Sequence, residues 1–93
     1  HIRPHTTSFD SFSHTLSKPI NQDVFEQFLR QLPPSIYRLK GFVAFEEDST
    51  YLVNYVAGRW DLEPSNAEHH VLVFIGENIS LVKNKLINLL QRL

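Results

Sequence analysis

The residues best suited to chemistry lie together at Glu68, His69 and His70, directly before the apolar run from Val71 to Ile75. Imidazole nitrogen and carboxylate oxygen are both zinc ligands. Neighbouring side chains on a strand point to opposite faces, so His69 and His70 do not readily close on one ion. We therefore expect the polar entrance of a buried strand, and at most half of a metal site shared with another element or domain.

Two further histidines, His1 and His5, lie in a leader that also carries Arg3 and Pro4. Short histidine tracts are a compositional hint of metal binding. The leader is either the remnant of a histidine-bearing linker or sequence added for expression, and both interpretations stay open. Because the chain begins with histidine instead of methionine, we expect it to be a piece of a longer protein.

No pattern for nucleotide binding or nucleophilic catalysis occurs in this sequence. The glycines Gly41, Gly58 and Gly76 are too far apart to cradle a phosphate, and the P-loop pattern is absent. We expect these glycines to mark bulges or close backbone approaches. A serine, histidine and aspartate set can be assembled only from neighbours within residues 10–14, whose side chains alternate between two faces of a strand.

The composition fits one compact domain: the chain has 93 residues, of which 42% are hydrophobic. Its net charge of -1 gives no electrostatic reason to bind nucleic acid or an anionic membrane. Cysteine is absent, which excludes disulfides, thiolate zinc sites and cysteine nucleophiles in this chain. Without a signal peptide or an apolar run of roughly 20 residues, we expect a soluble, cytoplasmic protein.

Hydrophobic periodicity predicts an α+β fold. The expected elements are a strand from Thr6 to Leu16, a helix capped by Asn21 and stopped at Pro33, strands over Ile36–Phe45, Tyr51–Trp60 and His70–Gly76, and a helix capped by Ser80. A turn is expected over Glu46–Thr50 and a loop over Leu62–Glu68. The order strand, helix, strand, strand, strand, helix predicts a four-stranded, mainly antiparallel sheet with both helices on one face, a ferredoxin-like variant.

The three later strands are apolar on both sides, whereas two short helices can cover only one face of the sheet. The second face, with aromatic side chains from the set Phe42, Tyr51, Tyr55 and Trp60, therefore needs cover of its own. Either the leader and the loop fold across it, or a partner binds there.

The segments SIYRLKGFVAF, GRW and HHVLVFIGENI, in this order and spacing, resemble the C-terminal domain of the CobW family of metal-linked P-loop GTPases. The most specific part is YRLKGF, from Tyr37 to Phe42, and the likeness runs from about His5 to the end. It implies a linker remnant over 1–5 and a CobW-like C-terminal domain over 6–93. Arg38, Lys40, Gly41 and Phe42 match the family pattern, and Arg38 and Lys40 join the candidate interface.

The resemblance implies an accessory, non-catalytic domain that contacts its own N-terminal GTPase domain and a client metalloprotein. The full-length protein is expected to hydrolyse GTP, with GTP and Mg²⁺ bound in the upstream domain and zinc or cobalt carried transiently, the latter for cobalamin synthesis. A homo-oligomer is left open. The alternative is a free-standing small-molecule or metal-binding module with a pocket on the second sheet face.

Overall fold

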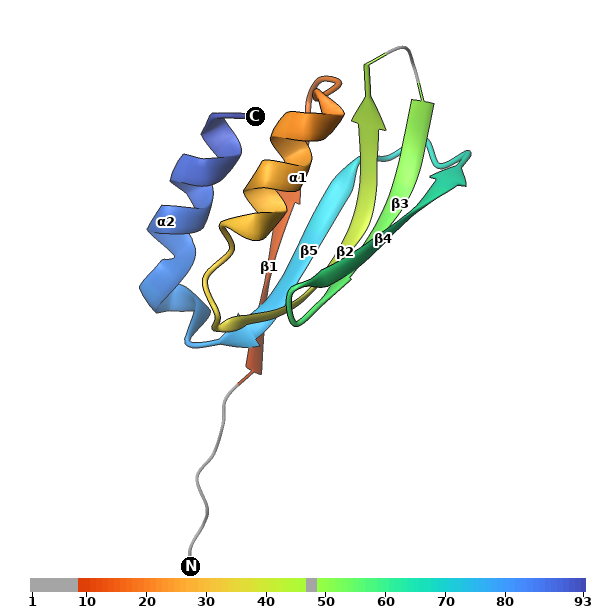
Figure 1. The fold of residues 1–93 in the computed structure, drawn as a ribbon. Coiled ribbons are helices and arrows are strands. Elements are labelled where there is room, and N and C mark those ends of the chain that lie inside the picture. Colours follow the sequence, from red (N-terminus) through yellow and green to blue (C-terminus); the bar gives the residue numbers. More distant parts are fainter. Residues whose placement is uncertain (1–8, 47–48) are drawn as a thin grey trace, which may run out of the picture.

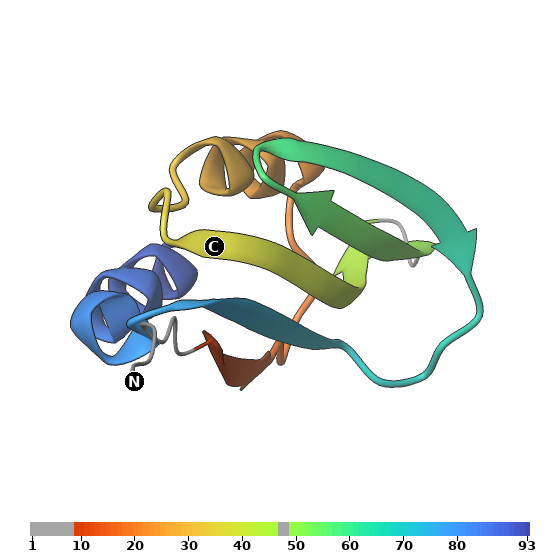
Figure 2. The same cartoon turned by 90° about the horizontal axis from the view of Figure 1, so that it is seen from below.

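The computed structural model describes residues 9–46 and 49–93, which form an antiparallel sheet with two helices packed on one face (Figure 1). A view turned by 90° shows both helices on the same side of the curved sheet (Figure 2). The elements are β1 (Phe9–Thr15), α1 (Gln22–Arg30), β2 (Ile36–Phe45), β3 (Ser49–Val56), β4 (Arg59–Ser65), β5 (Val71–Glu77) and α2 (Ile79–Gln91). The α+β class and the placement of the helices are as predicted.

The sheet has five strands in the order β1-β5-β2-β3-β4, so the prediction of four strands is wrong. β5 pairs antiparallel with β1 on one side and with β2 on the other. β1 and β2 therefore run in the same direction, with α1 as the crossover between them and β5 inserted in the gap. This split crossover is the arrangement of ferredoxin-like folds, here extended by one edge strand.

The extra strand arises because the segment predicted as one strand from Tyr51 to Trp60 is a hairpin. Ala57 and Gly58 both have positive φ, 49° and 91°, and Val56 pairs with Arg59 across the two-residue turn. Positive φ at both turn positions is the geometry of the tight hairpin turns that suit the twist of a sheet. β4 then continues to Ser65, into the segment predicted as a loop.

A local capping residue correctly predicts the start of α1 but not the start of α2. The Asn21 side chain caps α1 as predicted, with its Oδ1 accepting a hydrogen bond from the Val24 amide at 3.1 Å. α2 begins at Ile79, after Asn78 in a left-handed conformation, so the prediction of Ser80 as its cap is wrong. Ile79 is itself buried in the core, which makes it the first residue of the helix's apolar stripe.

The core lies between the two helices and the sheet. Aromatic rings join its layers: Phe25 of α1 packs edge-on against Phe45 at 5.8 Å, and Phe28 packs edge-on against Phe74 at 6.2 Å. The largest fully buried side chains are Phe25, Leu29, Ile36, Leu39, Val43, Val53, Leu72, Phe74 and Leu86. The apolar side of α2 faces this core, because Leu86 and Leu90 are buried and Val82, Leu89 and Leu93 pack against it.

Two glycines allow β2 and β5 to approach closely, as expected from the sequence. A Cβ atom on Gly41 would lie 2.0 Å from the Val71 carbonyl oxygen, and one on Gly76 would lie 2.3 Å from the Ser35 carbonyl oxygen. Gly58 differs, because its surroundings are open and its positive φ serves the β3–β4 turn. The expectation of a bulge or close approach is therefore wrong for Gly58.

Candidate interaction face

The candidate site is the sheet face that points away from the helices, which we call the outer face. Its side chains alternate along each strand with those of the core. On β2, Lys40 and Phe42 flank the buried Gly41. On β5, Val73 lies between the buried Leu72 and Phe74. The outer face includes Phe9, Ser11 and Ser13 of β1; Val71, Val73, Ile75 and Glu77 of β5; Tyr37, Arg38, Lys40 and Phe42 of β2; Leu52, Asn54 and Val56 of β3; and Arg59, Asp61 and Glu63 of β4.

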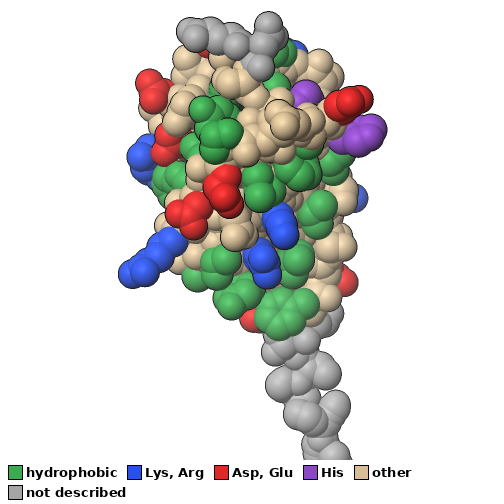
Figure 3. All heavy atoms as spheres, turned by 90° about the vertical axis from the view of Figure 1, so that its right-hand side faces the viewer, with side chains coloured by type: hydrophobic (Ala, Val, Ile, Leu, Met, Phe, Trp, Pro, Cys, Tyr) green, Lys and Arg blue, Asp and Glu red, His purple; other side chains and the backbone are tan. Residues whose placement is uncertain are grey.

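The centre of the outer face is apolar and slightly hollowed. A shallow depression of about 470 Å³ is lined by Arg38, Lys40, Phe42, Leu52, Val73 and Ile75. From the side of β3 and β4, hydrophobic side chains gather around Lys or Arg side chains, with Asp or Glu side chains beside them (Figure 3). The expectation of apolar side chains on both faces is confirmed for β5, where Val73 and Ile75 are half-buried on the outer face, whereas β4 carries Arg59, Asp61 and Glu63 there.

The two cations in the centre lack an acidic cross-strand neighbour. Lys40 lies opposite Val73 on β5 and Asn54 on β3. Arg38 lies opposite Ile75 and Val56. The acids of the outer face on β4 are two strands from β2, about 10 Å at ordinary strand spacing. The side chains directly opposite each cation are therefore apolar or neutral, and the outer-face acid of β5, Glu77, lies opposite Phe9 of β1 instead. Both cations are available to an external carboxylate.

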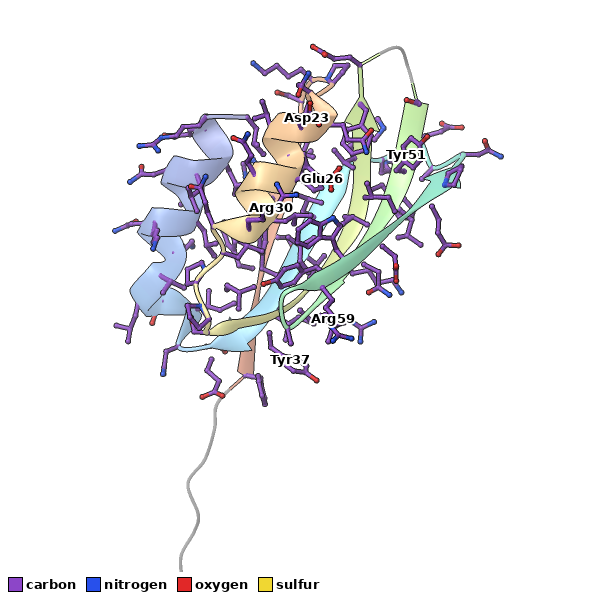
Figure 4. The ribbon with its side chains drawn as sticks, viewed as in Figure 1. Asp23, Glu26, Arg30, Tyr37, Tyr51 and Arg59 are labelled. Carbon is purple, nitrogen blue, oxygen red and sulfur yellow. The ribbon has the colours of Figure 1, made fainter. Side chains whose placement is uncertain are left out.

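A β-bulge adds an aromatic side chain at one end of this face. The β2–β5 register shifts between Ile36 and Arg38, which leaves Tyr37 as the extra residue. A bulge of this kind redirects a side chain, and Tyr37 is 52% exposed with its ring 6.2 Å from that of Phe9 (Figure 4). Phe9 lies in continuous register opposite Glu77 and is 56% exposed.

Three aromatic residues predicted for the second face lie on the helix-covered face instead. Tyr55 is buried and stacks on Trp60, with ring centroids 6.4 Å apart, and Tyr51 packs on Phe45 at 5.3 Å. Tyr51 and Tyr55 lie opposite Val43 and Leu39 on the core side of β2. The tight turn at residues 57–58 reverses the chain and sets Trp60 directly opposite Tyr55. The placement of Tyr51, Tyr55 and Trp60 on the second face is therefore wrong, whereas that of Phe42 is right.

Trp60 instead anchors β4 to α1. Its Nε1 donates a hydrogen bond to Oε1 of Glu26 at 3.1 Å, and the Arg30 guanidinium lies 5.5 Å from the indole centroid. Glu26 and Arg30 both extend from α1 on the side of the strands (Figure 4). These contacts give Trp60 a structural role and remove it from the interaction surface.

The histidine cluster lies in the segment before β5, as the strand entrance expected from the sequence. Glu68 and His69 are exposed, whereas His70 is half-buried with its Nε2 3.2 Å from Oγ1 of Thr50. Within residues 9–46 and 49–93, no three His, Cys, Asp or Glu side chains gather as metal ligands would. The half-site at Glu68, His69 and His70 stays a prediction.

Some predicted positions lie outside the described residues. These are His1 and His5 of the leader, and Glu47 and Asp48 of the predicted turn. Neither described helix has the length and apolar content that a bilayer span requires.

A family model described as the cobalamin synthesis protein cobW C-terminal domain matches residues 9–93. The chain is a CobW C-terminal domain. The family inferred from YRLKGF and its neighbouring segments is thereby confirmed. A search of curated proteins found no match to this CobW C-terminal domain.

Two solved structures share the fold of this CobW C-terminal domain. Zn(II)-bound YjiA GTPase from E. coli is 20% identical with a TM-score of 0.61, and a Zn(II)-bound triple mutant of YjiA GTPase is 19% identical with a TM-score of 0.62. Each likeness covers 87% of this chain and 29% of the YjiA chain. The domain thus spans less than a third of the length of these GTPases.

Proposed function

We propose that this CobW C-terminal domain is an accessory, non-catalytic domain of a GTPase metallochaperone. It contacts the GTPase domain of its own polypeptide and a client metalloprotein in the cytoplasm. The observation that carries the proposal is the family match over residues 9–93. The likeness covers 29% of the length of each zinc-bound YjiA GTPase chain. This supports an accessory role for the present domain, with nucleotide chemistry in the larger remaining part of the polypeptide.

The described geometry also supports binding of GTP and Mg²⁺ elsewhere in the polypeptide. A phosphate-binding loop presents several successive backbone amides around flexible glycines. Here Gly41 and Gly76 lie against the backbone of neighbouring segments, and Gly58 belongs to a two-residue hairpin turn. Zinc or cobalt would be transient cargo, with Glu68, His69 and His70 as a partial ligand set at most.

A free-standing small-molecule module is the second candidate, and the shape of the outer face argues against it. Small-molecule sites bury most of the ligand in a concave pocket. The depression on the outer face is lined only by residues of β2, β3 and β5. A flat, strand-built surface of this kind is better suited to another protein surface.

Removal of residues 9–93 from the full-length protein tests the accessory role. We expect the shortened protein to retain GTP affinity in calorimetry, because the nucleotide site lies upstream. Its GTP turnover and zinc affinity should change, because an accessory domain that contacts the GTPase domain differently in each nucleotide state is coupled to that cycle. Unchanged turnover together with unchanged zinc affinity would contradict the proposal.

A further inference from the structure

We infer that the outer face is the docking surface for the upstream domain of the same polypeptide, which would present apolar side chains together with carboxylates to it. The inference rests on the proposed function, because it requires an upstream domain. It goes further by assigning the contact to one face, to named side chains and to a partner surface of stated chemistry.

The residue types on the outer face are those of a protein interface. Aromatic residues and arginine are enriched in interface cores and among the side chains that dominate binding energy. The outer face carries Phe9, Tyr37 and Phe42 together with Arg38, around the apolar side chains of β5. An antiparallel sheet with one face left in water would show polar side chains there instead.

The charges define what the partner must offer. Arg38 and Lys40 lie beside Val73 and Ile75 and have no acid directly opposite on the neighbouring strands. Covering these cations with an apolar surface alone would cost desolvation free energy without compensation. A partner with carboxylates at these two positions would form charge-assisted hydrogen bonds instead, including a bidentate one with the guanidinium of Arg38.

The connection of the chain favours the upstream domain over a second copy. Phe9, where β1 begins, belongs to the outer face and contacts Tyr37, so the preceding polypeptide joins the domain beside this surface. A tethered domain has an effective concentration of about 1 mM. A contact with a Kd of only about 100 μM would therefore give roughly ten docked molecules for each undocked one. A second copy at micromolar concentration would compete poorly.

Hydroxyl-radical footprinting of the full-length protein and of this chain alone tests the inference. Oxidation of Phe9 and Tyr37 should fall roughly tenfold in the full-length protein, the protection expected from a tethered contact of that strength. Leu81 of α2, which is 80% exposed on the helix side, should be oxidised equally in both and is the internal control. The charge-reversal pair Arg38→Glu and Lys40→Glu should restore oxidation of Phe9 and Tyr37, whereas Lys83→Glu and Lys85→Glu on α2 should not.

Two results would overturn the inference. One is equal oxidation of Phe9 and Tyr37 in the two proteins, which would leave the outer face exposed to solvent. The other is protection in the isolated chain that grows with its concentration, which would assign the face to a second copy. Absence of GTP binding by the unmodified full-length protein would be a different result, because it would contradict the proposed function and not only the assignment of the outer face.

Discussion

Gly41→Val should destabilise the domain by more than about 4 kcal/mol, the range reserved for backbone strain and severe core disruption. Even the first side-chain atom has no room, because a Cβ at this position would lie 2.0 Å from the Val71 carbonyl oxygen and 2.8 Å from the Leu72 Cα. Backbone atoms in the neighbouring strand cannot rotate away as a flexible side chain would. The β2–β5 pair at the centre of the sheet would have to separate.

Urea unfolding followed by circular dichroism measures this effect, with alanine at two glycines as the matched comparison. Gly41→Ala meets the same backbone collision. Gly58→Ala places its Cβ in open space. It should lose only about 1–2 kcal/mol of unfolding free energy, because alanine is strained in the left-handed conformation of this position. Equal losses of unfolding free energy for the two alanine variants would show that the close strand approach at Gly41 is wrong.

Phe74→Ala should cost about 3–5 kcal/mol of unfolding free energy, the usual range for a buried phenylalanine. Its side chain is fully buried on β5 and joins three elements. The ring lies 5.8 Å from that of Phe12 on β1 and 6.2 Å from that of Phe28 on α1. Truncation therefore leaves a cavity where two strands and a helix meet.

Phe9→Ala is the control for this prediction, since it removes the same side chain from an exposed position on the neighbouring strand. A surface substitution of this kind should change the unfolding free energy of the isolated domain by no more than about 0.5 kcal/mol. A cost for Phe74→Ala as small as that for Phe9→Ala would contradict the core described above.

Much of the fold could be predicted because its signals are local. The alternation of Leu39, Gly41 and Val43 with Lys40 and Phe42 predicts both faces of β2, and the structure confirms each of them. The Asn21 cap is equally local, since its side chain bonds an amide only three residues away. The apolar run of β5 likewise predicts a buried strand, and in the structure β5 lies inside the sheet, paired on both sides.

The errors arise where conformation depends on contacts distant in sequence. Ala57-Gly58 lacks the Asn-Gly or Asp-Gly pair that marks a tight hairpin turn, and only its pairing partners identify β3 and β4 as separate strands. The bulge at Tyr37 is likewise visible only against β5. The turn sets Trp60 opposite Tyr55, its stacking partner on the helix-covered face, whereas an uninterrupted strand from Tyr51 to Trp60 would hold the two side chains on opposite faces.

The candidate face was accordingly predicted in part. Arg38, Lys40 and Phe42 lie on it, because the strand period of β2 is regular from Arg38 onward. Phe9 and Tyr37 are further members, which the sequence does not predict because the place of Phe9 depends on the β1–β5 register and that of Tyr37 on the bulge. An interrupted alternation before YRLKGF is the one sequence signal that could have drawn attention to Tyr37.

We expect this CobW C-terminal domain to leave nucleotide chemistry to another part of the polypeptide. Calorimetric titration of GTP with Mg²⁺ into this chain and into the full-length protein tests it most directly. We expect binding by the full-length protein and no detectable binding by residues 9–93, because the described glycines form no phosphate-binding loop. Micromolar affinity of GTP for the isolated chain would contradict it.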